Sequence, residues 1–362
     1  MLPAIRMRYL VQPSTGQPDR RPSEFSRDGA AAGVWFPRAS RVMLLAALLA
    51  AVLAARGAFA AGPPLRVVIQ PSQGTLEVLR GEQKLLVYAY ATNQFKPYVR
   101  ALYTLEGDNI LRDAPADHLH HHGLMYAVRV NGTNFWEERQ DPGHECSVKL
   151  LSHRVATGPT GQPEAVFTQL IHWVAAKDAG LADTTPAALL VEQRTLTLTV
   201  DEDQREVGLR WQAEFQAGPA AQKITLSGAN YHGLGLRLPV EFDHAAQHQN
   251  SEGLPYSAAQ RGDVTAARWS AVSHTINGHE VTIALFNRPS NAGQSRFFTM
   301  LDAFAYLSAT QNLDQAPLTY SAGDMFRIDY LLTVSPGRRN REVLTQRYDR
   351  WLRAPPGTGN RP

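Results

Sequence analysis

The sequence predicts an all-β protein, a large antiparallel β-sandwich with a short C-terminal helix. From about residue 64 the chain consists of short apolar runs, several of them alternating, separated by turn residues. Two Asn-Gly pairs lie between such runs, and helical periodicity is confined to the C-terminal end. A parallel sheet would need helices between its strands, so these observations favour antiparallel sheets.

The clearest strand is residues 206–216, where five apolar side chains follow a period of two. They are Val207, Leu209, Trp211, Ala213 and Phe215. The intervening side chains are polar, which predicts one face on a core and one face on solvent or ligand. Similar runs occur at residues 65–69, 75–79, 85–90, 166–174, 189–200, 223–226, 235–242, 304–308 and 325–334.

The two Asn-Gly pairs predict tight hairpins. Asn131-Gly132 follows the run at 128–130 and precedes Phe135-Trp136. Asn277-Gly278 lies between runs at 269–276 and 281–286. Both central positions of such a turn need positive φ, which asparagine and glycine adopt most easily.

One helix is expected, at residues 341–352, where apolar side chains share a stripe. Pro355-Pro356-Gly357 then begins a tail. The chain contains no repeat of fixed period and no long Ser/Gly linker, so residues 61–362 are predicted to form a single domain with its core at about 64–352.

Residues 1–60 form an N-terminal extension that is interpreted as ending in a signal peptide. Arg38 and Arg41 precede an apolar run of 14 residues at 42–55, and Ala58-Phe59-Ala60 follows. This order is typical of a secretory signal, while a membrane span needs about 20 apolar residues. The alternative is an uncleaved anchor. The prediction is a periplasmic or secreted protein with no stable membrane span after cleavage.

Cleavage would reverse the sign of the net charge. Of the 36 basic and 33 acidic residues, eight and three lie in the first sixty, which leaves 28 and 30, a net charge of about −2. The sequence pI near 9.0 therefore comes from the predicted leader. Nucleic-acid binding is not expected, because it needs a basic patch on the folded domain.

The densest polar cluster runs from Asp117 to Gly123 and contains His118, His120, His121 and His122. In an extended segment, the first, second and fourth of these histidines point one way and the third the other. Imidazoles supply acid–base groups that titrate near neutral pH, or ligands for zinc, copper or iron. If a metal binds, the expected ligands are His118, His120 and His122. The alternative is a surface loop without a ligand.

Residues on either side of the cluster could complete a sugar site. Lys96 and Tyr98 precede it, and Trp136 and Glu137 follow the first Asn-Gly turn. Aromatic rings stack on sugar faces and charged groups bind hydroxyls, although Tyr and Trp are also common core residues. Glu137, or its neighbour Glu138, could serve as a carboxylate base or end a solvated strand.

Several of these motifs resemble an uncharacterised bacterial family often labelled methane oxygenase PmoA-like. The motifs are the Lys-Pro-Tyr at 96–98, the His-rich stretch at 117–124, Asn131-Gly132, Phe135-Trp136-Glu137, Gly-Leu-Gly-Leu-Arg at 233–237 and residues 286–291. The resemblance covers about residues 64–352. The chain departs from the family pattern at two positions: Leu119 replaces the usual proline, and Arg100 stands where a histidine or other aromatic-type residue is expected. It implies a supersandwich related in shape to sugar mutarotases.

Three functional hypotheses follow. The first is an exported carbohydrate-active enzyme (a lyase, hydrolase or isomerase) acting on a sugar or glycan. Its candidate catalytic residues are His118, His120, His121, His122 and Glu137, and its candidate substrate-binding residues are Lys96, Tyr98, Trp136 and Arg237. The second, implied by the family label, is a copper- or iron-dependent oxidoreductase. The third is a non-catalytic glycan-binding module. The sequence leaves the cofactor and the oligomeric state open.

Overall fold

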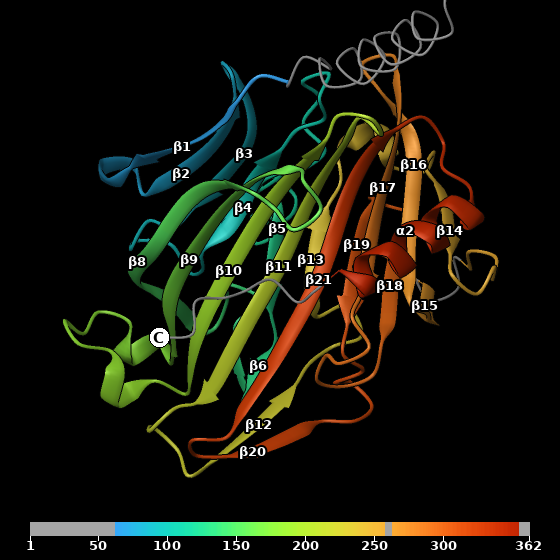
Figure 1. The fold of residues 1–362 in the computed structure, drawn as a ribbon. Coiled ribbons are helices and arrows are strands. Elements are labelled where there is room, and N and C mark those ends of the chain that lie inside the picture. Colours follow the sequence, from blue (N-terminus) through green and yellow to red (C-terminus); the bar gives the residue numbers. More distant parts are fainter. Residues whose placement is uncertain (1–61, 258–262, 355–362) are drawn as a thin grey trace, which may run out of the picture. The chain divides into compact units, whose positions relative to one another are not determined.

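Antiparallel sheets dominate the computed structural model, which describes residues 62–257 and 263–354 (Figure 1). The described residues belong to one contact unit, Ala61–Pro362. The predicted signal peptide and the tail from Pro355 lie outside the described residues. Within the described ranges, no helix is long and apolar enough to cross a membrane.

Strands in the described ranges form three sheets, and all their pairings are antiparallel. The nine-stranded sheet contains, in order, β1 (Leu65–Gln70), β2 (Thr75–Arg80), β3 (Gln83–Ala89), β4 (Tyr98–Leu102), β5 (Leu124–Ala127), β13 (Gly233–Arg237), β19 (Tyr306–Thr310), β18 (Arg296–Met300) and β15 (Asp263–Ala266). The eight-stranded sheet contains β14 (Gln247–Asn250), β16 (Trp269–Ile276), β17 (His279–Asn287), β21 (Met325–Pro336), β11 (Glu206–Ala217), β10 (Leu190–Asp201), β9 (Pro163–Val174) and β8 (His144–Thr157). The four-stranded sheet contains β20 (Leu318–Ser321), β12 (Lys223–Ser227), β6 (Arg129–Val130) and β7 (Thr133–Asn134).

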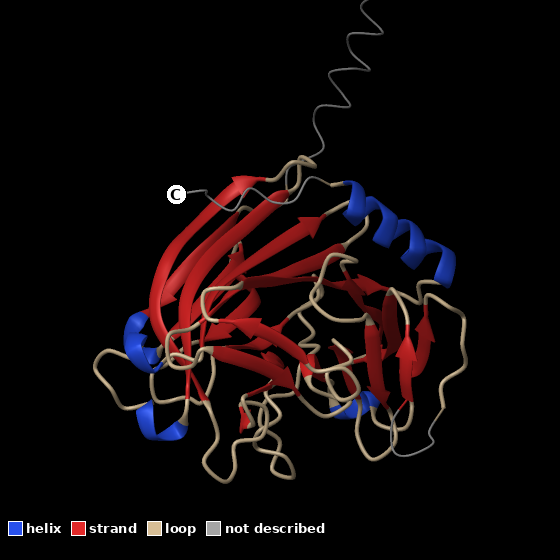
Figure 2. Cartoon of the chain, turned by 90° about the horizontal axis from the view of Figure 1, so that it is seen from below, coloured by secondary structure: helices blue, strands red, loops and turns tan. Residues whose placement is uncertain are grey.

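The two large sheets pack face to face as a β-sandwich, as predicted (Figure 2). One hydrophobic core joins side chains such as Val78 and Leu86 of the nine-stranded sheet to Leu196 and Trp211 of the eight-stranded sheet. The five apolar side chains predicted to share one face of β11 are all at most 1% exposed. Alternation therefore identified the core face of this strand correctly.

Both predicted hairpins are present. Asn131 and Gly132 have φ of 49° and 82° between β6 and β7, and Asn277 and Gly278 have φ of 50° and 85° between β16 and β17. Positive φ at both positions is the geometry that such two-residue turns require.

The predicted C-terminal helix is α2 (Arg341–Arg353), and it packs on the outside of the sandwich (Figure 1). The Asn340 side chain caps it by accepting a hydrogen bond from the Val343 N–H at 2.9 Å. Its stripe buries Leu344, Tyr348 and Trp351 in a second, smaller core cluster with residues of β16, β17 and β21. The helix thus covers the outer face of the eight-stranded sheet.

Several regions differ from the sequence prediction, which did not include the short strands β4, β5, β14, β15, β18 and β20. The run at 235–242 is not one strand, because β13 ends at Arg237 and Pro239 leads into a 3-10 helix, Val240–Phe242. Other 3-10 helices span Pro71–Gln73, Ala176–Asp178 and Thr185–Ala187. Strand β8 was not predicted. It lies at a sheet edge, with bulges in its pairing to β9 and exposed Val148, Leu151 and Val155 that break the alternation.

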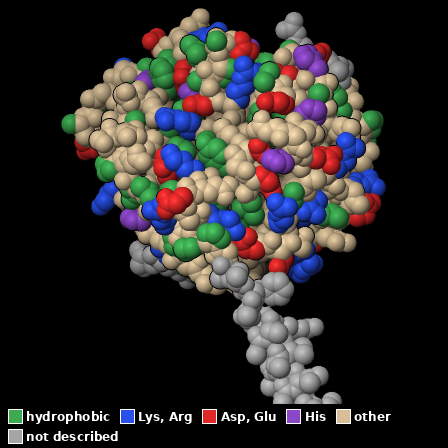
Figure 3. Space-filling model, turned by 90° about the horizontal axis from the view of Figure 1, so that it is seen from above, with side chains coloured by type: hydrophobic (Ala, Val, Ile, Leu, Met, Phe, Trp, Pro, Cys, Tyr) green, Lys and Arg blue, Asp and Glu red, His purple; other side chains and the backbone are tan. Residues whose placement is uncertain are grey.

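A buried ion cluster crosses the sandwich interior. Arg194 on β10 binds both carboxylate oxygens of Glu192, at 2.7 and 2.9 Å, and Glu145 of β8 at 2.9 Å. It also donates to the Pro97 carbonyl at 2.7 Å and contacts the Tyr88 hydroxyl of the other large sheet at 3.4 Å. The three charged side chains are at most 1% exposed. On the surface shown in Figure 3, by contrast, basic and acidic side chains are interspersed.

Candidate functional site

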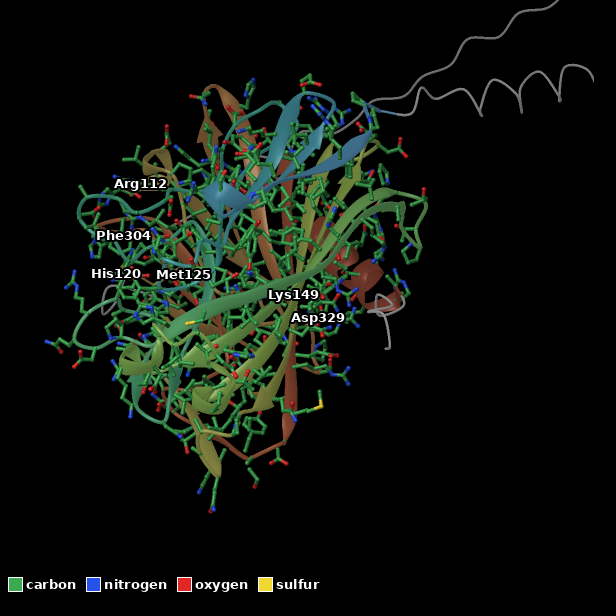
Figure 4. All side chains as sticks on the ribbon, turned by 90° about the vertical axis from the view of Figure 1, so that its left-hand side faces the viewer. Arg112, His120, Met125, Lys149, Phe304 and Asp329 are labelled. Atoms are coloured by element: carbon green, nitrogen blue, oxygen red, sulfur yellow. The ribbon has the colours of Figure 1, made fainter. Side chains whose placement is uncertain are left out.

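A cavity of about 460 Å³ opens beside the centre of the nine-stranded sheet. Its lining comes from the loop before β5, the segment after β7, the approach to β13, and β18, β19 and the loop between them. The lining residues are His118, His120, His121, Trp136, Glu137, Arg139, Asn230, Tyr231, Phe298, Met300, Phe304 and Tyr306. Strands β5, β13, β19 and β18 are direct neighbours in the sheet, which brings these distant segments together. Figure 4 places His120 and Phe304 on one side of the unit, away from Asp329.

The histidine segment is a pair of turns and not an extended strand. The His118 N–H donates to the Pro115 carbonyl at 2.8 Å, and the His121 N–H donates to the His118 carbonyl at 2.9 Å. The expected alternation is therefore wrong. Three rings line the cavity together, with centroids 4.5 Å apart for His118 and His121 and 4.7 Å apart for His120 and His121.

His122 lies outside the cavity lining and belongs to a network of partly buried charged groups. Its Nδ1 is 3.1 Å from Asp113 Oδ1, and its Nε2 is 3.0 Å from Glu138 Oε1. Burial alone would lower the pKa of His122, but these hydrogen bonds outweigh it, and the pKa is raised. Lys96, 1% exposed, donates to Glu138 at 2.6 Å and to the Trp136 carbonyl at 3.3 Å.

The predicted substrate-binding residues Lys96 and Tyr98 are accordingly outside the cavity lining. The Tyr98 hydroxyl donates to Asp113 at 3.1 Å, and its ring stacks on His122 at 4.1 Å. Lys96 holds the backbone of Trp136, whose ring forms a cavity wall. These residues contact the groups that form the cavity wall and are not themselves part of the lining.

Glu137 presents a carboxylate to the cavity and is held by several donors. Tyr231 donates its hydroxyl to Oε1 at 2.6 Å, and Asn134 donates its side-chain amide to Oε2. Burial alone would raise the pKa of Glu137, but the nearby His232 ring and these two hydrogen bonds outweigh it and hold the pKa well below its usual range. The carboxylate is therefore ionised at neutral pH.

His232, which was not among the predicted catalytic or binding residues, stands behind Glu137. It is 2% exposed, and neither ring nitrogen has a hydrogen-bond partner. Its ring lies parallel to Trp136 at 5.4 Å, and its Nε2 is 3.7 Å from Glu137 Oε1. The adjacent Gly233, with φ of 130°, was a usable signal, because a side chain there would overlap the Ala309 carbonyl.

Arg237, also predicted to bind substrate, is not in the cavity lining. Its guanidinium lies 3.7 Å from the centroid of the Phe304 ring, and Phe304 forms a cavity wall. Its nearest carboxylate oxygen, Asp117 Oδ2, is 3.9 Å away. Burial lowers the pKa of Arg237 to about 10, so it remains a cation.

The structure thus brings His118, His120, His121, Trp136 and Glu137 to one cavity. The remaining predicted residues, Lys96, Tyr98, His122 and Arg237, lie behind it. Lining residues that were not predicted include Arg139, Asn230 and the aromatic side chains from β18, β19 and their loop. Arg139 directly follows Glu137-Glu138, whereas the sequence positions of the others are far from the histidines.

The residues do not fit the expected metal site. His118 and His120 face the cavity, whereas both nitrogens of His122 are engaged by Asp113 and Glu138. Within residues 62–257 and 263–354, no group of three His, Cys, Asp or Glu side chains could hold a metal ion. The predicted ligand set is therefore not assembled.

The cavity histidines are expected to make the protein less stable in mild acid. Burial, with neighbouring positive charges, lowers the pKa of His120 to about 4 and of His121 to about 2. The unfolded chain, with histidine pKa near 6.5, then binds more protons than the native state, so stability is lost as pH falls below about 6.5. We expect a loss of roughly 2 kcal/mol per histidine at pH 5.

Thermal melts at pH 7 and pH 5 test this expectation. The double variant His120→Asn/His121→Gln should lose less stability between the two pH values than the unmodified chain, while His153→Gln, at an exposed position on β8, should behave like the unmodified chain. Equal losses in all three proteins would show that the cavity histidines are not the acid-sensitive groups.

Comparisons with known proteins identify a family whose function is unknown. A family model described as "Family of unknown function (DUF6807)" matches residues 75–349. The comparison with curated sequences found no match.

Solved structures with a similar chain path include glycoside hydrolases. The GH36 alpha-galactosidase AgaB from Geobacillus stearothermophilus is 12% identical, with a TM-score of 0.42, covering 76% of this chain and 41% of that one. The galactosidase domain of the alpha-galactosidase-sucrose kinase AgaSK is 11% identical, with a TM-score of 0.42, covering 78% and 43%. The Slr1438 protein from Synechocystis sp. PCC 6803 is 8% identical, with a TM-score of 0.34, covering 76% and 96%. The chain spans about two fifths of the galactosidase chains.

Proposed function

The chain belongs to the family of unknown function DUF6807, and we propose that it is a carbohydrate-active enzyme whose substrate binds in the cavity beside His120 and Glu137. The observation that carries this proposal is the combination of aromatic walls and polar groups in one cavity. Trp136, Tyr231 and Phe304 offer ring faces, while the histidines, Glu137 and Asn230 offer hydrogen-bonding groups. Its volume of about 460 Å³ lies within the range typical of small-ligand sites.

The protonation states support acid–base chemistry. Glu137 is an ionised carboxylate and can accept a proton from a substrate hydroxyl, a water or an acidic carbon. His120 and His121 are neutral at pH 7, so each ring can donate one hydrogen bond and accept another. Lyase, hydrolase and isomerase reactions of sugars all use a proton acceptor, and the neutral rings can orient the substrate through hydrogen bonds.

The oxidoreductase implied by the PmoA-like label is not our proposal. Copper or iron would need several ligands converging on one point. Here Asp113 and Glu138 hold His122 away from the other histidines. No step of the proposed chemistry is routed through a metal.

We also propose that the protein acts outside the cytoplasm. The basic flank, the 14-residue apolar run and Ala58-Phe59-Ala60 support export to the periplasm or the medium, with cleavage near Ala60.

A binding and turnover panel tests the proposed function. Purified protein would be titrated with monosaccharides, uronic acids and disaccharides while tryptophan fluorescence is followed, because Trp136 forms part of the cavity wall. Binding should change the fluorescence of the unmodified chain, and the change should shrink in Trp136→Phe. Product formation would then be followed by chromatography. Binding without turnover would favour the glycan-binding module, and the absence of any sugar binding would refute the proposal.

A further inference from the structure

Arg237 is a buried cation with unused hydrogen-bonding capacity. Its side chain is 1% exposed, and Nε and Nη1 have no hydrogen-bond partner. The nearest carboxylate oxygen, on Asp117, is beyond hydrogen-bond distance at 3.9 Å, and Asp117 is already bonded to His118 at 2.9 Å. The charges of Asp243 and Asp117 act on Arg237 from a distance, but neither is within hydrogen-bond distance of its guanidinium. The guanidinium lies against the Phe304 ring, so its positive charge stands directly behind that cavity wall.

A second arginine stands on the cavity side. Arg139 lines the cavity, is exposed, and has no hydrogen bond or ion pair within the described residues. Burial is the main cause of the lowered pKa of His120, and the positive charge of Arg139 is the next. The pKa of His121 is lowered by burial, by the neighbouring His120 and His118 rings, and then by the charge of Arg237. The histidine end of the cavity is therefore flanked by two guanidinium groups.

The acidic side chains near the histidine end of the cavity already have hydrogen-bond partners. Glu138 is bonded to Lys96 and His122, and Asp117 is bonded to His118. Glu137 accepts hydrogen bonds from Tyr231 and Asn134. Both donors to Glu137 are neutral, so Glu137 keeps its negative charge. The exposed Arg139, without a hydrogen bond or ion pair among the described residues, is therefore the group that is open to an incoming anion.

We propose that the substrate carries a carboxylate, as a uronic acid residue does, and that this group binds at the histidine end of the cavity against Arg139. Arg237 adds positive charge from behind Phe304, and a neutral histidine ring donates a hydrogen bond. Guanidinium–carboxylate pairing is stronger than hydrogen bonding between neutral groups, so it selects an acidic sugar over its neutral parent. This inference rests on the proposed function, because it names the substrate class of the same site.

The test compares paired ligands on the full chain by titration calorimetry. D-glucuronate is compared with D-glucose, and D-galacturonate with D-galactose, at low and high salt. We expect the acid of at least one pair to bind about tenfold more tightly than its parent, with an advantage that falls as salt rises. Arg139→Gln should remove the advantage. Arg154→Gln, an exposed arginine on β8 outside the cavity lining, should keep it.

Each outcome decides a separate point. Sugars that bind without preference for the acid would overturn this inference and leave the proposed function standing. An acid preference that survives in both Arg139→Gln and Arg237→Gln would also overturn it, because the charge would then be recognised elsewhere. No binding of any of the four ligands, alone or in the wider panel, would overturn the proposed function and the inference with it. Circular dichroism of Arg237→Gln would confirm that this buried variant is folded.

Discussion

Replacing Glu137 by glutamine is expected to lower turnover of the cavity's substrate by about 10²- to 10³-fold, as loss of a general base typically does. Glutamine keeps the size of the side chain and one acceptor oxygen, so the cavity should keep its shape. It cannot accept a proton at neutral pH. We therefore expect the loss in kcat and only a small change in substrate affinity, measured by steady-state kinetics and titration.

Tyr231→Phe is the matched control, because it removes one donor to the carboxylate without removing the carboxylate. The hydrogen bond from Tyr231, 2.6 Å long, helps to hold the pKa of Glu137 well below its usual range. Without it the pKa rises, and activity should begin to fall at a higher pH as the solution is acidified. Unchanged turnover in Glu137→Gln, or an acid limb that does not move in Tyr231→Phe, would remove Glu137 from the proposed chemistry.

Local patterns predicted the scaffold because local physics determines it. The alternation in β11 reflects one face in the core and one outside, and each Asn-Gly pair supplies the positive φ that its turn needs. Strand β8 escaped detection for the same reason. At a sheet edge, with bulges and exposed apolar residues, it lacks the alternating burial on which the prediction depends.

The site was predicted only in part, because non-local pairing builds it. The histidines were found from their density, but their turn geometry depends on backbone bonds such as that from the Ala114 N–H to the His121 carbonyl, with Ala114 at φ of 42°. Tyr231 and Phe304 reach the cavity only because β13 and β19 pair beside β5. No spacing rule in one sequence gives that strand order. Gly235 is one sequence feature that reflects this pairing of β13 with β19, because a side chain there would overlap the Tyr306 hydroxyl.

Removal of Arg194 is expected to cause the largest loss of stability. The Arg194→Met variant keeps most of the apolar volume but leaves the buried carboxyl groups of Glu192 and Glu145 without their cation. Breaking a buried ion pair from one side typically costs about 3–5 kcal/mol. Urea unfolding curves at pH 7 would measure the loss. The triple variant Arg194→Met/Glu192→Gln/Glu145→Gln should recover much of it, since no uncompensated charge remains.

The same variant should depend on pH in a defined direction. Burial, with the nearby charge of Glu192, already raises the pKa of Glu145 against the attraction of Arg194. In Arg194→Met that opposing attraction is gone, so the native state binds more protons than the unfolded chain above the ordinary glutamate pKa of about 4.3. Stability must then fall as pH rises, and the deficit relative to the unmodified chain should be larger at pH 8 than at pH 5. A deficit independent of pH would mean that lost packing over Trp211, 4.5 Å from the guanidinium carbon, and not the buried carboxyl groups, accounts for the destabilisation.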